Sequence, residues 1–165
     1  MTGRDRKPLL RQYREGPDRI AASVASLTES ELDYKPADGG WSPREVVHHT
    51  ADSEMTSAIR LRRLIAEDKP TILGYDGDQF ARRLFYRERL VEPSLKAIRA
   101  VRESSASILE RLQETDWNRA GTHSEIGPYS VEHWLEIYAV HCHEHAEQIE
   151  RVVSETRARQ SRLQT

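Results

Sequence analysis

The sequence predicts an all-α fold, a four-helix bundle with long connecting loops. Hydrophobic residues recur at the three- and four-residue spacing of amphipathic helices in four long segments of the 165-residue chain. No segment alternates between apolar and polar residues as a half-buried strand does. Stretches that contain Pro and Gly separate the four segments, and helices of this length pack as a bundle. These loops are long enough that the topology need not be simple up-and-down.

The first long helix is expected to begin at Gly16, with Pro17 in its first turn, where the N–H that Pro lacks would have no partner. Apolar residues then follow at helical spacing. A short turn or helix is expected at residues 28–31, because Thr28 and Glu31 can form a capping box, each binding the other's backbone N–H.

The clearest helix start in the chain is at Ser42. Ser42 can cap the N-terminus, a Pro follows it, and Glu45 can complete a second capping box. This second long helix is expected to run to about Glu67. A loop at residues 68–79 and a shorter helical piece at about residues 78–90 follow it.

The third long helix is expected after Pro93, and a loop at about residues 115–129 precedes the last helix. Ser130 can cap that last helix, which is expected to reach Thr156. We therefore expect one domain over residues 1–165, with frayed tails at about residues 1–15 and 157–165.

Composition argues against several kinds of partner. The net charge is -2 and basic residues are scattered among acidic ones, so nucleic-acid binding is not expected. No stretch approaches the roughly 18 apolar residues of a membrane span, and the charged N-terminus lacks the apolar core of a secretory signal. The single cysteine, Cys142, cannot form an internal disulfide, which indicates a reducing compartment. We expect a cytoplasmic protein.

Several histidines fall in the last helix, and helical geometry separates them by face. His141 and His145 are four residues apart, so they lie one turn apart on one face and can bind one ion. His145 lies within the apolar stripe of the helix, and His141 lies at its edge. His143 is about 200° from His141 and falls among Glu side chains, so it is expected on the solvated face.

A third ligand is expected from the second long helix, which carries His48 and His49 about 100° apart. The face of His49 also carries Ser53, Thr56 and Arg60, which are small or polar side chains that suit the lining of a cavity. The neighbours of His48 form a less coherent set. We therefore prefer His49 as the ligand.

Spacing alone leaves two alternatives to metal binding open: hydrogen-bonded core histidines and surface histidines. Cys142 points about 100° away from His141 and is expected to be a small buried residue rather than a ligand. Asp52 and Glu54 could accept a ligand's second ring N–H or act as a base, although most such carboxylates are simply solvated. Arg60 could bind a carboxylate or phosphate of a substrate, or be a structural residue.

Two segments carry a family resemblance. The first is GGWSPREVVHHTADSEMTSAIR at Gly39–Arg60, followed by Pro70 and a Tyr-Asp pair. The second is His141–Ile149, which matches a His, three residues, a His and then Gln-Ile. Together they resemble the DinB/YfiT-like superfamily, and its YfiT branch most. One departure is Glu144 in place of the commoner His before His145, and it leaves the ligand position intact.

The resemblance implies a four-helix bundle and often a homodimer. It also implies one divalent ion per chain, zinc or nickel, bound by His49, His141 and His145 with open positions. YfiT-like proteins are described as metal-dependent hydrolases, and relatives as thiol transferases or isomerases that use bacillithiol or mycothiol. An ion in a three-histidine site can activate a bound water or a thiol.

We therefore expect a metal-dependent enzyme with a small-molecule substrate and no membrane partner. A low-molecular-weight thiol S-transferase, which would use the thiol as a cofactor, is placed slightly ahead of a hydrolase. Arg60 and Asp52 are the candidate catalytic residues. A further alternative is a non-catalytic bundle that the metal only stabilises.

Overall fold

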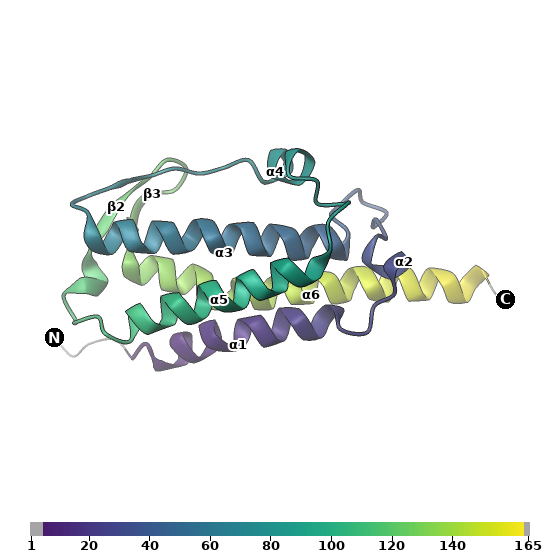
Figure 1. The fold of residues 1–165 in the computed structure, drawn as a ribbon, viewed down its shortest axis with the longest axis horizontal. Coiled ribbons are helices and arrows are strands. Elements are labelled where there is room, and N and C mark those ends of the chain that lie inside the picture. Colours follow the sequence, from purple (N-terminus) through teal and green to yellow (C-terminus); the bar gives the residue numbers. More distant parts are fainter. Residues whose placement is uncertain (1–4, 164–165) are drawn as a thin grey trace.

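The computed structural model describes residues 5–163 and confirms the helical bundle. Four long helices lie side by side: α1 (Lys7–Val24), α3 (Pro43–Ala66), α5 (Val91–Leu109) and α6 (Val131–Leu163) (Figure 1). The connections contain the short helices α2 (Glu29–Leu32) and α4 (Gly77–Arg83) and the 3₁₀ helix η1 (Asp116–Asn118). Within the described part of the chain, no helix combines the length and apolar character of a membrane span.

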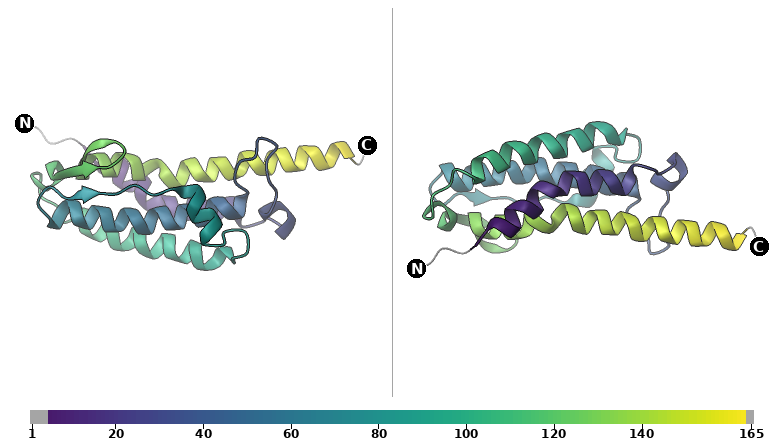
Figure 2. Two further views of the ribbon diagram at one scale, coloured as in Figure 1. Left: turned by 90° about the horizontal axis from the view of Figure 1, so that it is seen from above. Right: turned by 90° about the horizontal axis from the view of Figure 1, so that it is seen from below.

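The four long helices are not joined in a simple up-and-down order. α1 and α6 run in one direction, and α3 and α5 run in the other (Figure 1). α1 packs against α5 and α6, and α3 packs against the same two helices. Because α3 and α5 are parallel, residues 67–90 must return along the length of α3 before α5 begins. This crossover runs along the face formed by α3 and α6 (Figure 2).

A small sheet at one end of the bundle was not expected. Its strands, in the order β1-β2-β3, are β1 (Thr71–Ile72), β2 (Ala120–His123) and β3 (Gly127–Ser130). β1 pairs with β2 in parallel, and β2 pairs with β3 antiparallel. The prediction of a plain loop at residues 115–129 is therefore wrong, because strands of two to four residues are too short to show an alternating pattern.

The predicted helix caps are confirmed. Complete capping boxes begin α2 at Thr28 and α3 at Ser42, and α3 ends at Ala66. At the start of α6, the backbone N–H of His133 donates to Ser130 Oγ at 3.1 Å. These caps involve residues within one turn of each other, which is why sequence alone reveals them.

Both terminal helices are longer than predicted. α1 begins at Lys7 rather than at Gly16, and α6 runs to Leu163. Much of the tails expected at residues 1–15 and 157–165 is thus helical. The N-terminal extension also contributes to the core, since the side chain of Tyr13 is fully buried.

Pro17 lies inside α1 instead of at its start. A proline within a helix leaves the carbonyl group four residues earlier without its usual N–H partner. That carbonyl belongs to Tyr13, and Arg102 Nη1 donates to its oxygen at 2.6 Å. A side chain from α5 therefore replaces the hydrogen bond that Pro17 removes, and the helix continues.

Two apolar clusters fill the bundle, with a polar layer between them. One cluster is rich in aromatic residues, including Trp134 and Tyr138, and the other is mainly aliphatic, including Ile98 and Ile149. Between the two clusters along the helices lie Gly16 of α1, Glu54 of α3, Arg102 of α5 and His141 of α6.

Replacing Gly16 by Ala is expected to destabilise the protein, although Ala favours a helix by about 1 kcal/mol over Gly. An added Cβ would lie 2.3 Å from Arg102 Nη1 and 2.9 Å from Cys142 Cβ. The guanidinium cannot move away without breaking its buried hydrogen bonds. We expect the free energy of unfolding to fall by about 1–3 kcal/mol, as measured by urea denaturation.

The control is Glu15→Ala at the exposed neighbouring position, which should change stability by less than about 0.5 kcal/mol. A Gly16→Ala variant as stable as the wild-type protein would show that α1 does not require this close approach.

Candidate metal centre

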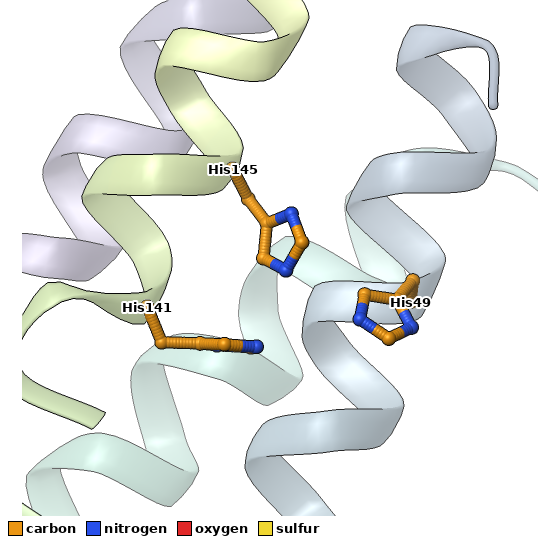
Figure 3. A group of neighbouring side chains, drawn as sticks. All are labelled: His49, His141 and His145. Carbon is orange, nitrogen blue, oxygen red and sulfur yellow. The ribbon is translucent and has the colours of Figure 1, made fainter. Parts of the chain in front are cut away.

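α3 and α6 bring three histidines together. One candidate ligand atom from each of His49, His141 and His145 lies within 4.8 Å of the other two (Figure 3). The ring centroids of His141 and His145 are 4.6 Å apart, and those of His49 and His145 are 4.9 Å apart. The structure thus brings together the three residues selected from the sequence. Their role as metal ligands stays a prediction.

His48 points away from this cluster. Its Nδ1 and Ser94 Oγ are 2.8 Å apart, and its Nε2 and the carbonyl oxygen of Arg89 are 3.2 Å apart. Both ring nitrogens are therefore engaged with the start of α5 and the residues before it. His48 is a hydrogen-bonded core residue, and the geometry agrees with the preference for His49.

His143 also lies apart from the cluster, but not on a solvated face. Its Nε2 donates to the carbonyl oxygen of Gln12 at 3.0 Å, and its side chain is half-buried against α1. The expected exposure of His143 is wrong because α1 covers this side of α6. Glu147 and Glu150, which were placed on the same face, are exposed.

Two of the three clustered rings are held by an oxygen acceptor at Nδ1. His141 Nδ1 lies 3.0 Å from Glu54 Oε1, and His145 Nδ1 lies 2.9 Å from Gln148 Oε1. A carboxylate oxygen cannot donate, so the proton sits on Nδ1 of His141 and its Nε2 carries a lone pair. Metal-binding histidines are usually oriented in this way. Gln148 holds His145 by the same kind of contact.

His49 is enclosed differently. Its ring centroid lies 4.5 Å from that of Trp41, and a Cβ added to Gly77 would lie 3.7 Å from its Nδ1. Its Nδ1 is buried and has no hydrogen-bond partner within residues 5–163. Buried polar atoms without partners are rare in protein cores. This argues against His49 as a simple hydrogen-bonded core histidine.

Burial keeps His49 and His145 of the cluster unprotonated at neutral pH. Burial, and then the charges of His145 and His141, lower the pKa of His49 to about 3. Burial, and then the charge of His141, lowers the pKa of His145 to about 4. Metal ligation requires unprotonated imidazole. These donors therefore fit a divalent cation.

Glu54 next to the cluster is ionised. Its burial opposes ionisation, but the charge of Arg102 and the hydrogen bond from His141 prevail and lower its pKa to about 2. The contact with His141 agrees with the expectation that Glu54 could accept a ligand's second ring N–H.

Arg60, a candidate catalytic residue, reaches the site through Tyr138. Arg60 Nη2 donates to the carbonyl oxygen of Leu73 at 2.6 Å. Burial raises the pKa of Tyr138, and a hydrogen bond from Arg60 is one of the contacts that limit this rise. The ring centroid of Tyr138 is 5.2 Å from that of His141.

Asp52, the other candidate, is engaged in the core. The hydroxyl of Tyr86 donates to Asp52 Oδ2 at 2.5 Å, and both side chains are buried. Thr56 was expected to line a polar cavity beside His49. Its hydroxyl is already engaged, because Thr56 Oγ1 donates to the backbone oxygen of Asp52 at 2.7 Å. Action of Asp52 as a base stays a prediction.

Gly77, where the crossover enters α4, lies beside His49, since a Cβ added to it would be 3.7 Å from Cε1 and Nδ1 of that ring. α4 contains no buried residue. The hydrogen bonds that hold this part of the crossover include Arg60 Nη2 to Leu73 O (2.6 Å), Gly74 N to Ser124 Oγ (2.9 Å) and Trp41 Nε1 to Asp78 Oδ1 (3.1 Å).

Known proteins are similar to this chain in sequence and in fold. A profile of the DinB superfamily matches residues 12–149. A protein of Oceanobacillus iheyensis is 36% identical over 78% of this chain and 74% of its own length. YfiT of Bacillus subtilis is 30% identical over 79% of this chain and 74% of its own length. Both are provisionally named metal-dependent hydrolases.

The solved structure of Bacillus subtilis YfiT superimposes with a TM-score of 0.87 at 26% identity. The match covers 93% of this chain and 89% of that one. That protein is described, provisionally, as a metal-dependent hydrolase with an unusual four-helix bundle topology.

Arg60→Met is expected to loosen residues 73–77. The variant loses the charged hydrogen bond to Leu73, a class of contact that contributes about 1.5–3 kcal/mol. We expect amide hydrogen exchange in this segment to accelerate by about tenfold, as measured by mass spectrometry.

Arg62→Met is the matched control, because Arg62 lies on the opposite side of α3 and donates to Ser104 Oγ at 2.8 Å. Exchange at residues 73–77 should be unchanged in that variant. Unchanged exchange in Arg60→Met as well would mean that the remaining contacts of the segment suffice to hold it.

Proposed function

This chain belongs to the DinB superfamily, and from that membership and its clustered histidines we propose that it is a metal-dependent enzyme with one divalent ion per chain. The convergence of His49, His141 and His145 to within 4.8 Å carries the proposal. Zn²⁺ and Ni²⁺ are the ions we propose, because imidazole nitrogen suits both.

Three neutral imidazoles would leave an ion its full charge and at least one open position, which is typical of catalytic rather than structural sites. Such an ion supplies Lewis acidity and lowers the pKa of a coordinated water toward neutrality. The protein's own part is to orient His141 and His145 through Glu54 and Gln148. Trp41 and Gly77 lie against the ring of His49 and help to shield it from solvent.

We infer that the reaction is hydrolysis of a small molecule, because relatives at 30% to 36% identity carry that provisional name. The thiol S-transferase favoured by the sequence analysis is the second candidate, since an open coordination position also accepts a thiolate. Cys142 cannot supply that thiol, because it is fully buried and burial raises its pKa. The thiol would be a soluble cofactor.

Arg60 is the residue we propose to bind an anionic group of the substrate. The Nε of Arg60 is buried without a hydrogen-bond partner among the described residues. The other contacts of its guanidinium are with the carbonyl oxygen of Leu73 and with Tyr138. A planar guanidinium in this place suits a carboxylate or a phosphate.

Purified protein should contain about one divalent ion per chain by elemental analysis. Replacement of His49, His141 or His145 by Ala is expected to abolish tight binding, because two imidazoles hold a divalent ion much more weakly than three. The control is His143→Ala, which removes a neighbouring histidine of α6 that bonds to Gln12 instead. Loss of the ion in His143→Ala but not in His141→Ala would refute the assignment.

Substitution of cobalt(II) distinguishes the two reactions. A transferase should show a sulfur-to-metal charge-transfer band in the near ultraviolet with a small thiol, and metal-dependent conjugation of that thiol to an electrophile. A hydrolase should bind thiols weakly and cleave an ester or amide with an apparent pKa near 7.

Inertness in both assays, together with a melting temperature that falls sharply on chelation, would overturn both enzymatic readings. The ion would then only stabilise the bundle. The thiol assays should include the low-molecular-weight thiols of the source cell, because a generic thiol can lack the groups that Arg60 would bind.

A further inference from the structure

The polar layer of the bundle contains a fully buried ion pair. Arg102 Nη2 donates to Glu54 Oε1 at 2.7 Å, and the two side chains are 1% and 0% exposed. Charges this far from water are costly, and a pair of well-packed apolar residues often serves stability equally well. The position of the pair calls for a reason other than stability.

The guanidinium of Arg102 is fixed from several sides. It donates to the carbonyl oxygens of Tyr13 at 2.6 Å and Tyr138 at 2.7 Å, and it lies 4.3 Å from the ring centroid of Tyr13. These contacts come from α1 and α6, whereas Glu54 belongs to α3. Arg102 therefore holds the Glu54 carboxylate at a defined place relative to α6.

That place is beside the clustered histidines. The same oxygen, Glu54 Oε1, lies 3.0 Å from His141 Nδ1. Because a carboxylate only accepts hydrogen bonds here, the imidazole must carry its proton on Nδ1. The Nε2 lone pair of His141 is then left free for a ligand.

The other two rings are held less firmly. His145 Nδ1 faces the neutral amide oxygen of Gln148, which lies on the same helix. His49 Nδ1 has no hydrogen-bond partner in the described part of the chain. His141 is the ring of the cluster whose orientation is set by a charged group from another helix.

We propose that Glu54, held by Arg102, is a positioning residue that sets the tautomer and ring orientation of His141 for metal binding. The proposal rests on the proposed metal site. It also gives Arg102 a second task, because its charge offsets that of Glu54 and keeps the site from gaining net negative charge. Neither residue contacts the substrate in this scheme.

Two double variants test the proposal. Glu54→Leu with Arg102→Met removes both charges and the acceptor, and Glu54→Gln with Arg102→Met removes both charges but keeps a neutral oxygen acceptor of similar size. Both avoid the unpaired buried charge that a single substitution would leave, so both are designed to fold. Urea denaturation shows whether they are equally stable.

The first measurement is the tautomer of His141 in the metal-free proteins, read from nitrogen-15 NMR of the imidazole rings. Wild-type protein and the Gln variant should show the proton on Nδ1. The Leu variant should shift toward the Nε2–H form that imidazole prefers in water. The tautomer of His145, which bonds to Gln148, should not change in either variant and is the internal control.

The second measurement is the affinity for Zn²⁺ alone, by competition with a chromophoric chelator. The Leu variant should bind Zn²⁺ about 10–100-fold more weakly than the wild type, and the Gln variant should recover most of that loss. Wild-type tautomer and affinity in the Leu variant would overturn the proposal. So would equal weakening in both variants with the tautomer unchanged, because the pair would then act only through the fold.

Failure of the metal site itself gives a different result. If the wild-type protein does not bind Zn²⁺ and none of the three histidine variants differs from it, the proposed function fails. The tautomer of His141 in the two double variants would still decide whether Glu54 positions this ring.

Discussion

The guanidinium of Arg102 is bound at one level of the bundle by groups from three other helices. The carbonyl of Tyr13 comes from α1, the carboxylate of Glu54 from α3 and the carbonyl of Tyr138 from α6. Removal of one partner from a buried charge costs about 3–5 kcal/mol. None of the four long helices can therefore slide or rotate at this level without a large loss of stability. This constraint contributes to the placement of α3 relative to α6, and with it to the arrangement of the histidine cluster.

The same constraint explains how two adjacent histidines differ so much. His48 is fully buried, and Ser94 and Arg89 bind its two ring nitrogens. His49, one residue on, faces α6 and the crossover instead. A rotation of α3 by the angle of one residue, about 100°, would exchange their environments. The buried apolar residues of α3 oppose that rotation, together with the contact between Glu54 and Arg102 little more than one turn further along α3.

Capping boxes and the clustering of His49 with His141 and His145 could be predicted because they follow from local or helical geometry. The ion pair of Glu54 and Arg102 could not be predicted, because a charged residue in a single sequence is normally expected on the solvated surface. Its only local sign is that Arg102 follows Ile98 by four residues and so falls on the buried stripe of α5. The prediction that Pro17 begins the first helix was wrong for the same reason. Its place inside α1 depends on Arg102, a residue far along the chain, which binds the carbonyl oxygen of Tyr13. The short strands depend on pairing between distant segments and carry little local signal.

The parallel neighbours α1 and α6 have a consequence for biosynthesis. Of the four long helices, α1 leaves the ribosome first and α6 leaves it last, yet each is a principal packing partner of the other. A nascent chain that ends before α6 presents His49 without either of its companions, and Arg102 without the carbonyl of Tyr138. Such a chain lacks two of the three histidines of the proposed metal site. Binding of an ion at that site would therefore require the complete bundle.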